Sequence, residues 1–144
     1  MTEIQFHFNV PDRLGYACRL LRKAARSVAG VAVSGPMELL TRLDRELWTF
    51  DPQAFVPHLL LRADERPAER LRATPVWLVE SPDTAAHLPV LVHLGDAPAS
   101  GFESFQRLVE VVSGNDGERE AARLRWRHYT NRGYRIERFD VAVA

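Results

Sequence analysis

Short apolar patterns typical of strands alternate along this chain with amphipathic helical patterns, and this alternation constrains the fold more than any other feature. The run Val31-Ala32-Val33, which lies between two helical patterns, is typical of a parallel strand covered on both faces. Strands that alternate with helices favour a three-layer α/β/α fold. At 144 residues the chain has the length of one domain with one core. We therefore expect a single domain over residues 1–144 with a mainly parallel central sheet, a mixed sheet being the alternative.

The positions of the expected elements follow from residue spacing. A first strand with one buried face is predicted from the alternating apolar residues Ile4, Phe6, Phe8 and Val10. Asp12 is placed to cap the helix that follows, and Gly133 to end the last helix. Cys18 falls on the apolar side of the first helix, where a buried structural thiol is expected. Further strands are expected at residues 31–33, 59–61, 76–79, 90–94, 108–112 and 134–141, and helices at 14–30, 37–47 and 116–131.

The turns after the first two strands lack the residues of a nucleotide site. Neither Asn9–Gly15 nor Ser34–Pro36 supplies GxGxxG or GxxxxGK[ST], so the fold is Rossmann-like without a nucleotide motif. The five histidines lack metal-ligand spacing, His7 and His93 fit hydrogen-bonded structural roles, and no serine lies in a GxSxG turn. We expect no catalytic residues, no metal and no cofactor. The alternative is a nucleotide- or phosphate-using α/β enzyme with a degenerate phosphate loop, which added nucleotide would stabilise against heat.

The charge of the chain is balanced as a whole but uneven locally. Nineteen basic residues offset nineteen acidic ones, so the whole chain has no electrostatic preference for nucleic acid. In residues 116–139, however, seven arginines accompany only four acidic side chains. No run reaches the ~18 apolar residues of a membrane span, and the polar start MTEIQFHF does not fit a signal peptide. We expect a cytoplasmic protein without membrane contact that meets nucleic acid only indirectly.

The last predicted helix carries a tryptophan among arginines. At about 100° per residue, one face of this helix holds Arg119, Arg123, Trp126, Arg127 and Thr130. A large apolar ring bordered by guanidinium groups suits a ligand that is both acidic and hydrophobic, such as a carboxylate-rich peptide. The opposite side is expected to pack inward through Ala121, Leu124 and His128, which leaves the tryptophan surplus to the core. Two alternatives stay open. In one the helix is simply solvated, with its tryptophan packed on a neighbouring loop, and in the other its ligand is duplex DNA, which so few arginines would bind weakly.

A segment broken by prolines after the second helix gathers three large aromatic residues. Trp48, Phe50 and Phe55 lie there, followed by Pro57. Aromatic side chains in an irregular segment either cover the edge of a core or form a hydrophobic hot spot for a partner protein. The residues alone leave both interpretations open.

Two motifs resemble the chi subunit of bacterial DNA polymerase III. They are LDRELWTFDPQAFVPH at Leu43–His58 and RWRHYTNRGY at Arg125–Tyr134, and the similarity extends over essentially the whole chain. The resemblance implies an accessory protein of the clamp loader in DNA replication, without catalytic activity. It also implies two partners: the psi subunit, and the acidic C-terminal tail of the single-stranded-DNA-binding protein, which ends in a hydrophobic residue with a free carboxylate.

The resemblance assigns residues of this chain to both partners. The tail-binding positions of the family correspond to Arg119, Arg123, Trp126 and Arg127. Tryptophan stands here where a tyrosine is familiar, and Thr130 stands where a basic residue can occur. The surface that faces psi is expected to comprise Trp48, Phe50, Phe55 and Pro57. The chain is thus expected to bridge psi to the single-stranded-DNA-binding protein.

Overall fold

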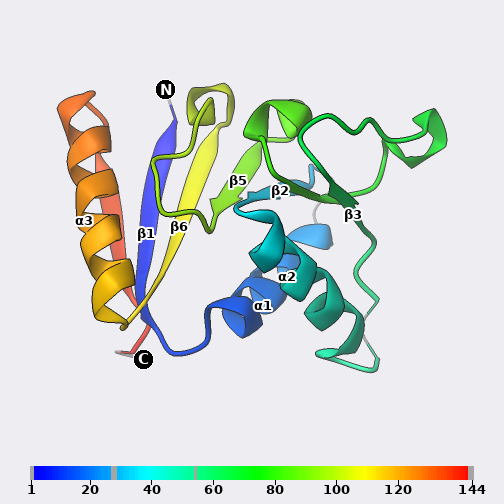
Figure 1. The fold of residues 1–144 in the computed structure, drawn as a ribbon, viewed down its shortest axis with the longest axis horizontal. Coiled ribbons are helices and arrows are strands. Elements are labelled where there is room, and N and C mark those ends of the chain that lie inside the picture. The colour runs from blue at the N-terminus through cyan, green and yellow to red at the C-terminus, as the bar shows by residue number, and fades with distance from the viewer. Residues whose placement is uncertain (1, 27–28, 54, 143–144) are drawn as a thin grey trace.

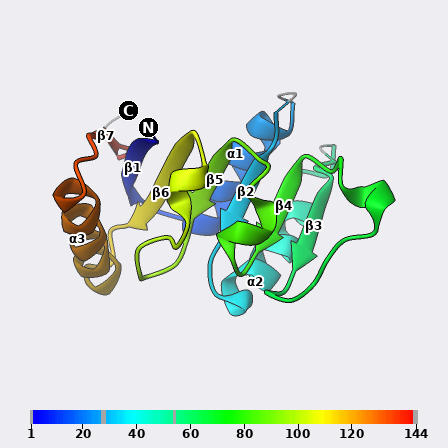
Figure 2. The ribbon, with the colours of Figure 1, turned by 90° about the horizontal axis from the view of Figure 1, so that it is seen from above.

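Seven strands form one parallel sheet across the centre of the molecule (Figure 1). The structure is a computed structural model that describes residues 2–26, 29–53 and 55–142. Every strand pairing within these residues is parallel, which confirms the mainly parallel sheet predicted from the sequence. Figure 2 shows the strands side by side in the order β3-β4-β2-β5-β6-β1-β7. The strands are β1 (Glu3–Val10), β2 (Val31–Ser34), β3 (His58–Leu61), β4 (Val76–Val79), β5 (Val90–His93), β6 (Arg107–Ser113) and β7 (Ile136–Asp140).

Helices on both faces of the sheet complete the predicted three-layer α/β/α arrangement. They are α1 (Arg13–Ala25), α2 (Met37–Thr49) and α3 (Asp116–Asn131). α1 and α2 contact each other on one face, whereas α3 packs on the other face against β6, at the end of the sheet where β1 lies (Figure 1). Single 3-10 turns lie in three of the connections, at Glu69–Leu71 (η1), Pro82–Ala85 (η2) and Phe102–Ser104 (η3).

The bounds predicted from residue spacing agree closely with the structure, with a few elements shorter than expected. α3 covers its predicted residues 116–131, and Gly133 follows it with a φ of +90°. Asp12 caps α1 as predicted, because its carboxylate accepts a hydrogen bond of 3.1 Å from the Gly15 N–H. α1 ends at residue 25, before the expected bound of 30, and residues 27–28 lie outside the described part of the chain. β7 covers 136–140 where 134–141 was expected.

The first strand differs from its prediction near its end. Ile4 and Phe6 are buried on the α3 side of the sheet, but Val10 is buried in the core beneath α1. The strand changes sides because its register shifts just before Val10, where Asn9 adopts a left-handed φ of 59° that asparagine tolerates better than most residues. Phe8, which precedes this irregularity, is left half-buried on the α3 side.

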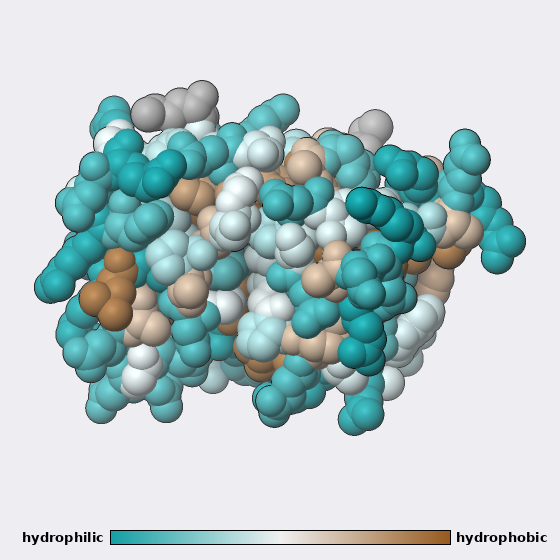
Figure 3. Space-filling view, turned by 45° about the horizontal axis from the view of Figure 1, so that its top comes forward, coloured by the Kyte–Doolittle hydropathy of each residue, from teal (hydrophilic) through white to brown (hydrophobic). Residues whose placement is uncertain are grey.

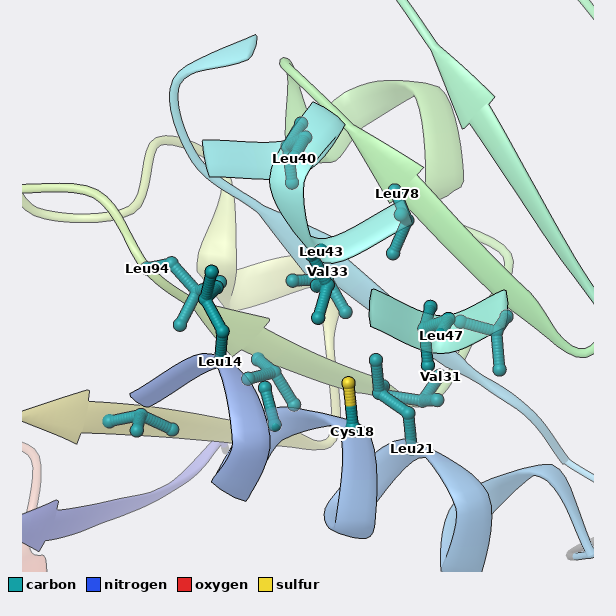
Figure 4. Packing of buried hydrophobic residues seen from close by; sticks show 14 of the residues in the cluster. Leu14, Cys18, Leu21, Val31, Val33, Leu40, Leu43, Leu47, Leu78 and Leu94 are labelled. Atoms are coloured by element: carbon teal, nitrogen blue, oxygen red, sulfur yellow. The ribbon is translucent and has the colours of Figure 1, made fainter. Parts of the chain in front are cut away.

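The core between the sheet and the first two helices consists of aliphatic side chains (Figure 4). The buried side chains that point toward one another from α1, α2 and β2 include one cysteine, Cys18, besides Leu14, Leu21, Val31, Val33, Leu40, Leu43 and Leu47. Cys18 is fully buried among them, which confirms the prediction of a structural thiol. Burial away from water, with smaller contributions from nearby carboxylates, raises the pKa of this thiol to about 12.

The Cys18 thiol is expected to react with the disulfide reagent DTNB only when the protein unfolds. The thiolate is the attacking species, and Cys18 is both shielded from solvent and protonated at neutral pH. Thiol release followed by absorbance, with and without guanidinium chloride, measures this difference, and Cys18→Ala provides the blank. Rapid stoichiometric labelling of native protein would contradict the placement of this side chain.

α3 packs inward through a different set of residues from the predicted one. Its buried residues are Ala122, Arg125 and Tyr129. The prediction of an inward side made of Ala121, Leu124 and His128 is wrong, since Leu124 is 61% exposed and His128 is exposed as well. The physical reason is a buried carboxylate on β6, described below, which bonds to two polar residues of the helix. A pattern based on hydropathy alone places those polar residues outside.

The surface in Figure 3 is largely hydrophilic, with hydrophobic residues scattered among polar ones. Among the described residues, the large hydrophobic side chains that are exposed are Trp48, Phe55, Leu71, Leu124 and Phe139. Trp48 and Phe55 of this set are in ring contact with each other, and they form the second of the two candidate surfaces described next.

Candidate functional site

A pocket of about 450 Å³ lies between α3 and the neighbouring strands of the sheet. Its lining residues come from α3, β1, β6 and β7, and are Phe6, Phe8, Val112, Arg119, Ala122, Arg123, Trp126, Arg127 and Arg138. The structure therefore brings together all four residues that the sequence assigned to tail binding. It adds an apolar floor from β1 and a fourth arginine, Arg138, from β7.

Trp126 forms a wall of this pocket and is half-buried. Its ring meets the Phe6 ring edge to face, with centroids 5.1 Å apart. The Arg138 guanidinium lies 5.9 Å from the Trp126 ring and 5.3 Å from the Phe8 ring. The prediction that the tryptophan is surplus to the core is therefore wrong in part, because one side of the ring packs on the core while the rest faces the pocket. Cation–π contact also fixes where the fourth guanidinium lies.

The rim of the pocket is strongly positive. Arg119, Arg123 and Arg127 are exposed along α3, and Arg138 is exposed on β7. Within the described residues, none of these four arginines forms a salt bridge. Their donors are therefore available to an anionic ligand, for which arginine offers paired, charge-assisted hydrogen bonds.

Thr130 shares the predicted helix face but is not part of the pocket lining. Its hydroxyl donates a hydrogen bond of 2.8 Å to the Trp126 carbonyl, a contact within the helix that is common for threonine. By contrast, Arg138 and the two phenylalanines of β1 were not predicted as site residues. The parallel pairing of β7 with β1 sets Arg138 beside Phe6, and the only sequence signal for it was the basic character of residues 116–139.

A buried ionic network holds α3 against the sheet beneath the pocket. The Arg125 Nε donates to one carboxylate oxygen of Glu110 on β6 at 3.1 Å, and the Tyr129 hydroxyl donates to the other at 2.6 Å. Arg125 also donates to the carbonyl of Asp96, and the Tyr129 oxygen accepts from the N–H of Ala99. Burial, together with the charge of Glu110, raises the pKa of Tyr129 well above its usual range. Every buried polar side-chain atom of this network has a hydrogen-bond partner. The network therefore fixes the rotation of α3 about its axis.

The second candidate surface lies at the C-terminal end of α2. Trp48 is 56% exposed and Phe55 is 70% exposed, and their ring centroids are 5.6 Å apart. Trp48 also lies 4.9 Å from the His58 ring. The His58 side chain is buried there, where its two nitrogens contact the Asp44 carboxylate at 2.8 Å and the Val56 carbonyl at 2.7 Å. The exposed Trp48 ring therefore packs on a histidine that is held by two hydrogen bonds.

The other two residues predicted for this surface are placed differently from the exposed pair. Phe50 is half-buried against the core beneath α1, and the Arg22 guanidinium lies 5.4 Å from its ring. Pro57 is also half-buried. Trp48 and Phe55 are thus the exposed aromatic residues of the segment, whereas Phe50 serves mainly to pack it onto the core.

Comparison with known sequences identifies the family. The family described as DNA polymerase III chi subunit, HolC, matches residues 1–137. A DNA polymerase III subunit chi from Pseudomonas aeruginosa is 33% identical over 144 aligned positions, which cover 95% of this chain and 95% of that protein. The chain belongs to the DNA polymerase III chi subunit family. The resemblance noted in the sequence is therefore confirmed, and the chain is an accessory-subunit homologue of a replicative polymerase.

The fold of this chi-family chain also occurs in a protein with almost no sequence similarity. The C-terminal domain of S. cerevisiae Dbp5, solved bound to Gle1 and IP6, superimposes with a TM-score of 0.62 at 6% identity. The alignment covers 97% of this chain and 90% of that one. At such low identity the similarity concerns the fold alone.

Other potential chemistry in the chi-family chain is accounted for by structural contacts. His93 is buried, with its ring nitrogens 3.0 Å from the Ser34 hydroxyl and 2.7 Å from the Ala97 carbonyl. His7 contacts Tyr16 and Gln5, so both histidines have the hydrogen-bonded roles that were predicted. Across the described residues no group of three or more His, Cys, Asp or Glu side chains is arranged to hold a metal ion. Nor does any helix there combine the length and apolar character needed to cross a membrane.

Proposed function

We propose that this chi-family protein is a non-catalytic subunit of the polymerase III clamp-loader complex. In this proposal it bridges the psi subunit to the acidic C-terminal tail of the single-stranded-DNA-binding protein. The observation that carries the proposal is the pocket beside α3, where an apolar lining that includes Phe6 and Trp126 lies within a rim of arginines. A tail that is acidic and ends in a hydrophobic residue has the same two features.

The pocket suggests how the tail binds. Carboxylates of the tail pair with Arg123 and its neighbours on α3, while the terminal hydrophobic side chain contacts the Phe6 and Trp126 rings. Several exposed charge pairs and one apolar contact correspond to an affinity in the micromolar range, about −8 kcal/mol at a Kd of ~1 μM. An interaction of this strength exchanges readily, which suits repeated capture of coated template.

The psi subunit is assigned to the aromatic surface formed by Trp48 and Phe55. Aromatic residues are enriched in protein interfaces, and tryptophan is among the residue types most enriched in interface hot spots; here an exposed tryptophan is in ring contact with an exposed phenylalanine. α2 and α3 cover opposite faces of the sheet and lie toward opposite ends of the strand order (Figure 1). The two partners therefore occupy separate surfaces and can bind at the same time, as a bridge requires.

Arg123→Ala is expected to weaken binding of the tail peptide by about tenfold to a hundredfold, because a charge-assisted hydrogen bond contributes about 1.5–3 kcal/mol. Fluorescence anisotropy with a labelled tail peptide measures this change. Arg45→Ala is the matched control, since Arg45 is an exposed helical arginine on α2, outside the pocket. Equal binding by wild type and Arg123→Ala, or no binding by wild type, would overturn the assignment.

A further inference from the structure

The first helix has a charge pattern that the proposed function does not use. Residues 13–37 contain five basic residues and no acidic one, within a chain whose net charge is zero. The five are Arg13, Arg19, Arg22, Lys23 and Arg26. Two of them have internal partners. Arg13 donates to the carbonyls of Val111 and Leu94, and Arg22 donates to the Asp51 carboxylate at 3.0 Å.

The remaining three, Arg19, Lys23 and Arg26, form a basic stripe along α1. All three are exposed, and none of them forms a salt bridge within the described residues. Their spacing of four and three residues places them on one side of the helix, within about 11 Å along its axis. Favourable contact with the helix dipole accounts for cations in the last turn. It does not account for Arg19, or for the lack of any acidic residue in the segment.

Partly exposed aromatic rings continue the basic stripe toward the sheet. The Arg19 guanidinium lies 5.8 Å from the Tyr16 ring, and the Tyr16 hydroxyl contacts His7 Nδ1 at 2.5 Å. The His7 ring lies 4.9 Å from Phe139, which is 40% exposed on β7. Burial lowers the pKa of His7, so its imidazole contributes an aromatic ring and no positive charge at neutral pH. The stripe and the rings lie on the α1 side of β1, away from the α3 pocket.

We propose that the basic stripe and the adjoining rings of Tyr16 and Phe139 contact the backbone and bases of single-stranded DNA directly, in addition to the indirect contact expected from the sequence. A single strand presents phosphates and unpaired bases together, and these match a surface where cations adjoin aromatic faces. Three cations bind DNA weakly on their own. The contact becomes effective when the α3 pocket holds the tail of a protein that is already on the strand, because tethering raises the local DNA concentration. This tethered part rests on the proposed function, whereas the contact itself does not.

Two anisotropy titrations test this proposal. The first uses a labelled oligothymidine at low salt. For wild type, a plot of the logarithm of the binding constant against the logarithm of the salt concentration is expected to have a slope of about −2. This value corresponds to three neutralised phosphates on a single strand. The second compares a tail peptide alone with the same peptide linked to oligothymidine. The linked peptide is expected to bind about tenfold more tightly than the peptide alone. This gain is the ratio of a millimolar effective DNA concentration to a Kd of ~10⁻⁴ M for DNA alone.

The decisive variant is the triple substitution Arg19→Gln, Lys23→Gln and Arg26→Gln. It is expected to weaken binding of bare oligothymidine and to remove the gain from linkage, while it binds the unlinked tail peptide like wild type. The matched control removes three exposed arginines elsewhere, Arg42→Gln, Arg45→Gln and Arg66→Gln, and is expected to keep both. Equal DNA binding by the two triple variants would overturn the proposal. If the tail peptide fails to bind at all, the proposed function fails, and the bare oligothymidine titration still decides for or against the stripe.

Discussion

Glu110→Ala is expected to lower the free energy of unfolding by about 3–5 kcal/mol, because it leaves a buried charge without its partner. Glu110 is fully buried and Arg125 is 3% exposed, and the carboxylate binds both Arg125 and the Tyr129 hydroxyl. Truncation removes the counter-ion of the guanidinium and leaves a cavity between β6 and α3. Since α3 buries only Ala122 besides the two polar residues, the loss falls on the helix that carries the pocket.

Urea unfolding followed by circular dichroism measures this effect, with the slope of the transition checked for constancy. Glu103→Ala is a close control. Glu103 also accepts from an arginine and a tyrosine, Arg132 and Tyr134, but this cluster is exposed, so a far smaller change is expected. Glu110→Gln keeps the side-chain shape and removes the charge, and is expected to fall between wild type and Glu110→Ala. A loss for Glu110→Ala no larger than that of Glu103→Ala would show that the network does not hold the helix.

This network also shows where prediction from the sequence succeeds and where it stops. The bounds of α3 follow from local signals, namely the helical spacing of residues 116–131 and the glycine at 133, and the structure adds a cap at Asn115. The rotation of α3 about its axis cannot be predicted from local signals, because the partner of Arg125 is Glu110, fifteen residues away on another element. An arginine in a basic segment is read as solvated unless its buried counter-ion is known. Leu124 was consequently assigned to the core, although it is exposed.

The pocket illustrates the same limit for strands. The arginines and the tryptophan on α3 were predicted, because helical spacing alone puts them on one face. Phe6 and Arg138 join them only because β7 returns parallel to β1, in a register that sets Phe6 beside Arg138. Pairing between strands more than a hundred residues apart has no local signal in one sequence. The aromatic segment after α2 was predicted as a cluster, but which of its rings are exposed depends on how Phe50 packs beneath Arg22.

Phe55→Ala is expected to weaken binding of the psi subunit by at least about thirtyfold, the effect of losing a hot-spot residue of about 2 kcal/mol or more. Phe55 is the most exposed of the large hydrophobic side chains described, and its ring contacts the tilted Trp48 ring. Its removal therefore affects a partner far more than the fold. Trp48→Ala is a less clean probe, because the Trp48 ring also covers His58, whose side chain is buried and bonded to Asp44.

Calorimetric titration of purified psi into wild type, Phe55→Ala and Leu71→Ala measures the effect. Leu71 is the matched control, since it is 38% exposed but lies on η1, outside the aromatic surface. Phe55→Ala is expected to bind the tail peptide like wild type, because the pocket beside α3 lies on the other face of the sheet. Similar loss of psi binding in Phe55→Ala and Leu71→Ala would indicate a nonspecific hydrophobic contact. Unchanged psi binding in Phe55→Ala would move the psi site away from this surface altogether, and only a selective loss places it on the Trp48 and Phe55 rings.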